Sequence, residues 1–146
     1  MLKGIPKIIS PALLKVLSEM GHGDTILIAD GNFPSESVGK DAAVIRCDGH
    51  GVPELLKAIL QLIPLDTHVE KPVKLMAVTP GDNVKTPIWK TYRELVSDCD
   101  SRGGAAFEEV ERFAFYETAK KAYAVIATGE SALYANILLQ KGVITD

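Results

Sequence analysis

The sequence predicts an α/β domain in which a largely parallel sheet is flanked by helices. Three observations support this prediction: short apolar runs alternate with segments of helical periodicity, most connections between them are short, and 47% of the 146 residues are hydrophobic. The length suits one domain. Because the chain shows no internal repeat, low-complexity tract or linker, we expect residues 1–146 to form a single unit.

The first two elements follow from local signals. Residues 11–20 are expected to form a helix, since Ser10 suits the N-cap and Pro11 suits the first helical position. Apolar side chains recur there at helical spacing, and Gly21 ends the pattern. A short apolar run then predicts a buried strand over residues 25–29.

The remaining chain continues the alternation of strands and helices. Residues 31–37 are expected to form a loop because of their glycine, asparagine, proline and serine content. A polar connection at 66–71 and a turn at 102–104 separate later elements. Strands are expected at 41–46, 73–79 and 123–128, helices at 52–63, 88–99 and 112–121, and a closing strand or mixed segment at 137–143.

Charge and hydropathy exclude several classes of protein. A net charge of −3 provides no basic field for nucleic acid. No apolar run approaches the roughly 18–20 residues that span a bilayer, and the first residues lack the apolar core of a signal peptide. We therefore expect a cytoplasmic protein that has no membrane partner, and we expect Cys47 and Cys99 to be free thiols.

His22 and Asp30 are the strongest candidates for chemistry. His22 lies between two glycines at the start of the first strand, and histidine is the side chain best matched to proton transfer near neutral pH. Asp30 follows the carboxyl end of that strand, where ligands bind in parallel sheets. The alternatives are a capping or surface histidine and an aspartate in an Asx-turn.

The spacing of these two residues raises a geometric difficulty. An extended run from Asp24 to Asp30 spans about 20 Å, so His22 and Asp30 on one straight strand cannot both contact a monosaccharide-sized ligand. Either the chain folds back around Gly23 or Gly31, or the site combines residues from neighbouring subunits.

Other polar residues are weaker candidates. Tyr134 and Asn136 face the same way in an extended segment and offer neutral groups suited to sugar hydroxyls. Arg112 could bind vicinal hydroxyls, although an exposed salt bridge is commoner. Cys47 and His50 have Cys-x-x-His spacing, but a metal site needs further ligands. A turn that leads into a helix, from which His50 could face a ligand, is the favoured interpretation, and we assign no metal site.

Several segments together resemble the ribose pyranase / L-fucose mutarotase family over essentially the whole chain. The matching segments, which occur in the family's order, are MLKGIP at 1–6, LSEMGHGD at 17–24, IADGNFP at 28–34, ATGE at 127–130 and YAN at 134–136. The L-fucose branch is more similar, because ERFAFY at 111–116 and DGHG at 48–51 suit it. Ribose-type members have histidine where Arg112 stands, and Leu133 replaces a proline of that branch.

The resemblance implies a cofactor-free isomerase that interconverts the α and β anomers of a free monosaccharide such as L-fucose. It also implies a ring-shaped homo-oligomer, commonly a decamer, with sugar sites near subunit interfaces. His22 would be the proton donor. The sugar-binding residues implied by the resemblance are Asp30, Arg112, Tyr134 and Asn136, with Met76 and Tyr116 at the pocket wall and a backbone contribution from Ala135.

Mutarotation needs one acid at the ring oxygen and one base at the anomeric hydroxyl. His22 would be the acid, and Asp30, Tyr134 or a water between them would be the base. An apolar wall for the fucose methyl group is expected from Phe33, Met76, Phe115 and Tyr116. The alternatives are a D-ribose pyranase, which interconverts pyranose and furanose forms, and a non-catalytic sugar-binding accessory protein.

Overall fold

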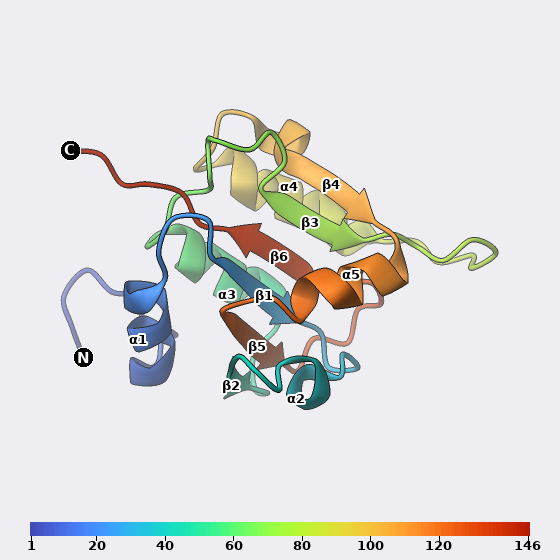
Figure 1. Cartoon of the computed structure of the whole chain (residues 1–146), viewed down its shortest axis with the longest axis horizontal. Helices are drawn as coiled ribbons and strands as arrows, with labels where there is room; N and C mark the ends of the chain where they lie inside the picture. Colours follow the sequence, from blue (N-terminus) through green and yellow to red (C-terminus); the bar gives the residue numbers. More distant parts are fainter.

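A six-stranded sheet forms the centre of the computed structural model, which describes residues 1–146. The strands are β1 (Thr25–Ala29), β2 (Ala43–Cys47), β3 (Val73–Met76), β4 (Phe107–Val110), β5 (Ala124–Thr128) and β6 (Ile137–Gln140). Their order across the sheet is β2-β5-β1-β6-β3-β4 (Figure 1). Five strands run parallel and β6 runs antiparallel to both of its neighbours, which confirms the predicted largely parallel α/β domain.

Helices cover both faces of the sheet. They are α1 (Pro11–Glu19), α2 (Ser35–Val38), α3 (Val52–Leu60), α4 (Pro87–Ser97) and α5 (Arg112–Ala119), together with the short 3₁₀ helix η1 (Gly103–Ala106). In Figure 1, α5 crosses the near face, while α3 and α4 lie behind the sheet. No helix combines the length and the hydropathy that crossing a membrane requires.

The central strands are apolar on both faces because both faces are covered. On β1, Ile26 and Ile28 belong to a large core shared with α1, α3 and α4. Leu27 and Ala29 belong to a smaller core on the other face, which includes Phe115 of α5. Strands buried on both sides read as continuous apolar runs, and this is why β1 and β5 were predictable from the sequence.

Three expectations about the elements were wrong in detail. The expected loop at 31–37 contains the start of the one-turn helix α2. The strand expected at 73–79 ends at Met76, after which the chain leaves the sheet. No strand was expected at β4, whose sequence Phe-Glu-Glu-Val has no apolar alternation. Parallel pairing with β3 and an ion pair between Lys74 and Glu108 (2.7 Å) hold this edge strand.

The antiparallel strand β6 determines where the loop that precedes it must lie. Its register places Ile137 beside both Ile28 of β1 and Leu75 of β3. Because β6 runs the other way, its first residue meets the carboxyl ends of those two strands. The connection from β5 to β6, residues 129–136, therefore passes over the carboxyl edge of the sheet, and we call it the edge loop.

The start of the edge loop leaves no room for a side chain, and this generates a stability prediction. A Cβ atom at Gly129 would lie 2.0 Å from the carbonyl oxygen of Asp48, whereas a Cβ atom at Gly49 would meet nothing within 4 Å. Overpacking costs about 1–3 kcal/mol and more against rigid backbone, so Gly129→Ala should lower the free energy of unfolding in urea by at least that amount. Gly49→Ala, the matched control, should change it by less than about 1 kcal/mol; equal effects would contradict the proposed close approach.

Candidate functional site

A hollow of roughly 330 Å³ lies at the carboxyl edge of the sheet. This size is near the lower end of the range for ligand sites, about 300–1,000 Å³. Its walls come from the ends of β1 and β3, the β3–α4 connection, the start of α5 and the edge loop. The lining residues are Asp30, Asn32, Phe33, Met76, Asp82, Val84, Arg112, Tyr116, Leu133, Tyr134 and Asn136.

Six of the seven side chains singled out as sugar-binding in the sequence therefore meet in one hollow. The seventh residue, Ala135, does not line it. Its side chain is fully buried, and the backbone contribution that the resemblance implies for it stays a prediction. This juxtaposition joins segments up to about a hundred residues apart in the chain, including Asp30 and Asn136.

Asp30 is a buried carboxylate fixed by its surroundings. Its backbone N–H donates to Oδ1 of Asn136 (2.8 Å), and its own Oδ1 accepts from the backbone N–H of Asn32 (3.0 Å). Burial raises the pKa of Asp30, and hydrogen bonds from the backbone N–H groups of Asn32, Ala135 and Phe33 offset only part of that rise. A carboxylate with a raised pKa is a stronger base than an exposed one.

Tyr134 is held in a backbone conformation that is uncommon for a residue with a side chain. Its φ is +55°, in the left-handed region, which costs on the order of 1–3 kcal/mol unless surrounding contacts impose it. Its hydroxyl accepts from the backbone N–H of Thr79 (3.2 Å) and donates to the carboxylate of Asp82. The edge loop and the β3–α4 connection are thereby joined across the hollow.

Two aromatic donors on α4 impose this conformation. Trp89 donates from Nε1 to the carbonyl oxygen of Tyr134 (2.7 Å), and the buried Tyr92 donates from its hydroxyl to the carbonyl oxygen of Ala135 (2.6 Å). The donors are three positions apart and so lie on one face of the helix. Consecutive carbonyl groups of the edge loop are thus satisfied by side chains, and the Tyr134 side chain is directed toward the hollow.

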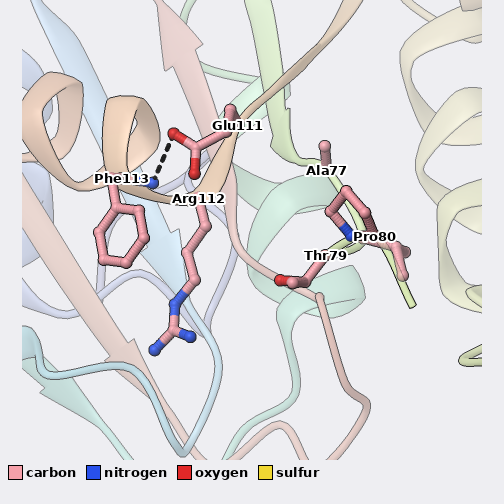
Figure 2. A pocket seen from close by; sticks show the side chains of 7 residues that line it. Ala77, Thr79, Pro80, Glu111, Arg112 and Phe113 are labelled. Carbon is pink, nitrogen blue, oxygen red and sulfur yellow. Dashed lines mark hydrogen bonds between the residues drawn. The ribbon is translucent and has the colours of Figure 1, made fainter. Parts of the chain in front are cut away.

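Arg112 is the first residue of α5 and reaches over the rim of the hollow. Arg112 also lines a neighbouring pocket, drawn in Figure 2, where its side chain extends between Phe113 on one side and Thr79 and Pro80 on the other. Its guanidinium carbon lies 5.7 Å from the ring centroid of Tyr116. A cation at a helix N-terminus opposes the helix dipole, so this placement does not serve the helix. The N-cap is Glu111, whose carboxylate accepts from the backbone N–H of Phe113 (2.9 Å).

The apolar wall differs from the expected one in a single residue. Phe33, Met76 and Tyr116 line the hollow as expected. Phe115 does not, because it is fully buried behind Phe33, with the two rings edge to face at 6.4 Å. Residues one apart on a helix point in different directions, so adjacent Phe115 and Tyr116 cannot both face the ligand.

His22 lies at the other end of β1, outside the hollow. The chain does not fold back around Gly23 or Gly31, and His22 instead meets the segment that follows α3. Its Nε2 lies 3.1 Å from Oδ1 of Asp66, and its ring centroid lies 4.8 Å from that of His68. The His22 side chain is 45% exposed and that of Asp66 is 2% exposed. One chain therefore does not contain His22 and the hollow in one site.

Asp66 was not predicted from the sequence, where it begins a polar connection. Its Oδ1 accepts from the backbone N–H of His68 (2.9 Å), and its Oδ2 accepts from Nε2 of Gln140 (2.9 Å). Burial acts to raise the pKa of Asp66, but these hydrogen bonds and the one from His22 outweigh it, and the pKa is lowered. No local signal marks Asp66, because its partners come from β6 and from the start of β1.

The Cys-x-x-His spacing marks a turn, as favoured from the sequence. The backbone N–H of His50 donates to the carbonyl oxygen of Cys47 (3.0 Å), and α3 starts shortly after. His50 Nδ1 lies 2.9 Å from a carboxylate oxygen of Glu54 and does not line the hollow. Cys47 and Cys99 are free.

Asp82, which lines the hollow from the β3–α4 connection, was also not predicted from the sequence. It occurs in a Pro-Gly-Asp-Asn segment typical of a turn. A turn aspartate is common, and nothing in the local pattern shows that Tyr134 lies opposite.

Comparison with known proteins gives a consistent result over the full length. A model of the RbsD / FucU transport protein family matches residues 3–144. Fucose mutarotase of Mus musculus is 52% identical over 147 residues, which cover 98% of this chain and 95% of the relative. The crystal structure of FucU from Bifidobacterium longum is 64% identical, with a TM-score of 0.97 and coverage of 98% of this chain and 100% of that chain.

Two solved structures of such proteins contain a sugar. The fucose mutarotase from Streptococcus pneumoniae in complex with L-fucose is 50% identical, with a TM-score of 0.92, and covers 99% of this chain and 100% of its own. RbsD of Bacillus subtilis complexed with D-ribose has the same coverage, but it is 27% identical and has a TM-score of 0.76. Sequence and backbone are thus both more similar to the fucose-bound protein.

The opposite pKa shifts of Asp30 and Asp66 generate a prediction about stability and pH. A raised pKa in the folded state means that stability falls as the pH rises above the unfolded value of about 3.9. A lowered pKa means that stability rises as the pH rises toward that value from below. From about pH 3 to 5, Asp30→Asn should therefore gain stability relative to the unsubstituted protein, and Asp66→Asn should lose it. Urea unfolding at several pH values measures both differences, and slopes of the same sign would contradict the assignment.

Proposed function

Because the chain belongs to the RbsD / FucU transport protein family, we propose that it is an L-fucose mutarotase that interconverts the α and β anomers of the free sugar. The proposal rests on the full-length similarity to a fucose mutarotase in complex with L-fucose, at 50% identity and a TM-score of 0.92. The lower similarity to the ribose-bound RbsD argues against a D-ribose pyranase. The reaction needs no cofactor, and we place it in the cytoplasm.

The hollow offers both kinds of contact that a 6-deoxy sugar requires. The hydroxyl groups would be bound by the carboxylate of Asp30, the amide of Asn136, the guanidinium of Arg112 and the phenol of Tyr134. The methyl group would lie against the apolar wall of Phe33, Met76 and Tyr116. Hydrogen-bond donors and acceptors together satisfy the hydroxyl groups, while the apolar side gains from excluding water.

His22 would donate the proton to the ring oxygen in a hollow of the adjacent subunit. Its hydrogen bond to the buried Asp66 orients the ring. Exposed apolar side chains lie at both ends of the sheet. They are Phe113 and Leu133 near the hollow, and Val143 and Ile144 after the end of β6. A head-to-tail contact between these ends would cover both sets of apolar side chains. Repeated with a rotation that closes, such a contact forms a ring, as the proposed decamer requires.

The chemistry then needs one acid and one base. His22 protonates the ring oxygen while Asp30 takes the proton of the anomeric hydroxyl, and the C1–O5 bond breaks to give the open aldehyde. Rotation about C1–C2 presents the other face of the carbonyl. As the ring closes, Asp30 returns its proton to the carbonyl oxygen and His22 takes back the proton of the O5 hydroxyl. Among the base candidates Asp30 is preferred, because burial raises its pKa toward the working pH, whereas the Tyr134 hydroxyl is already engaged with Asp82.

The first test is saturation transfer between the anomeric protons of L-fucose in the presence of the protein. Exchange should accelerate with protein concentration, and more for L-fucose than for D-ribose. His22→Ala should reduce the accelerated rate by about 10²–10⁴-fold while leaving the fucose dissociation constant, measured by calorimetry, largely unchanged. Equal losses of exchange and binding would contradict the acid role, and fucose binding without exchange in the unsubstituted protein would favour a non-catalytic binding protein.

A site shared between subunits can be tested by complementation. His22→Ala and Arg112→Ala should each be inactive alone, and differently tagged chains co-expressed and purified together should regain activity. Random mixing in a ring would restore about a quarter of the sites, since an intact hollow must face an intact His22. Co-purified mixtures as inactive as the single variants, or a monomer in analytical ultracentrifugation, would refute the shared site.

A further inference from the structure

Three potential metal ligands converge at the amino end of β1. They are His22, Asp66 and His68, which we call the amino-end cluster, and their ligand atoms all lie within 4.8 Å of one another. Oδ1 of Asp66 is 3.1 Å from Nε2 of His22 and 3.4 Å from Nδ1 of His68. Both imidazoles are exposed, whereas the carboxylate is buried, so an ion from solution can reach the cluster.

The two distances from Asp66 are close to those between ligands that share a metal ion. Nitrogen and oxygen ligands bind zinc at about 2.0–2.2 Å, which places tetrahedral ligands about 3.4 Å apart. Two imidazoles and one carboxylate also form a common ligand set for divalent first-row metals and leave coordination positions open for water. The imidazoles can approach such an ion by small rotations, because neither side chain is packed in the core.

The surroundings of Asp66 favour a cation. Gln140 donates to Oδ2 and the backbone N–H of His68 donates to Oδ1, contacts of the kind that orient a ligating carboxylate. No lysine or arginine forms a salt bridge with this carboxylate; Arg102 donates instead to the backbone carbonyl oxygen of Asp66 (3.1 Å). With neutral imidazoles the cluster carries one negative charge in a largely buried position, which a divalent ion offsets.

We propose that the amino-end cluster binds a divalent transition-metal ion of the zinc type, and that the bound ion inhibits the protein reversibly. Inhibition follows because the ion takes the Nε2 lone pair of His22 and displaces its hydrogen bond to Asp66. The inhibitory part rests on the proposed function of His22, whereas the binding part does not. The imidazole of His68 has no part in the proposed reaction, so a substitution at His68 tests metal binding separately from catalysis.

Calorimetry with Zn²⁺ in metal-free buffer, without sugar, tests the binding. The unsubstituted protein should bind one ion per chain. His68→Phe keeps a ring beside His22 but removes a ligand, and its affinity should fall at least about tenfold, as weaker perturbations of metal sites already do. His50→Phe, the matched control, removes a histidine paired only with Glu54 and should bind Zn²⁺ normally. Mg²⁺ should not bind, since it prefers oxygen ligands.

A second experiment follows fucose exchange during the Zn²⁺ titration. Exchange by the unsubstituted protein should fall as the site fills and should recover with EDTA, while His68→Phe should exchange normally and resist the same Zn²⁺ concentrations. No stoichiometric binding, or equal binding by His68→Phe, would overturn the site. Stoichiometric, His68-dependent binding in a protein that exchanges no fucose would support the site, but it would overturn the inhibitory role together with the proposed function.

Discussion

The antiparallel course of β6 through a parallel sheet is the constraint on which both the hollow and the amino-end cluster depend. Its amino end places Tyr134 and Asn136 of the edge loop at the carboxyl ends of β1 and β3. Its carboxyl end places Gln140 against Asp66, and Lys141, the next residue, binds the backbone of Gly23 (2.9 Å). One four-residue strand thus positions the hollow and the histidine, but at opposite edges of the sheet.

That separation links proposed activity to assembly. A strand of this length keeps its two ends too far apart for one small ligand, so an isolated chain would hold the proposed acid away from the proposed sugar site. The rigid features lie on the hollow side, where Trp89 and Tyr92 hold the backbone of Tyr134 in its left-handed conformation. Preorganisation of this kind lowers the entropic cost of ordering a binding loop when the sugar arrives.

Local signals predicted the elements that are decided locally. The cap at Ser10 and the apolar runs of β1 and β5 depend on neighbouring residues, and they were predictable. Strand β4 depends on pairing with β3, and its two consecutive glutamates remove the apolar alternation that would predict a strand. The same distinction holds for the site. Asp30 was found because it follows a buried strand, whereas Asp66 and Asp82 meet Gln140 and Tyr134, which are distant in sequence, only in the folded chain.

Asp30 and Asp66 show how one fold can shift the pKa of the same type of side chain in opposite directions. Both are buried, yet Asp66 accepts three hydrogen bonds and has a lowered pKa, while burial dominates at Asp30 and raises it. A carboxylate with a raised pKa accepts a proton more readily, whereas one with a lowered pKa stays ionised. Environments that drive the pKa values of two carboxylates apart fit them for different roles, which supports the proposal that Asp30 is the base and that Asp66 orients the proposed acid, His22.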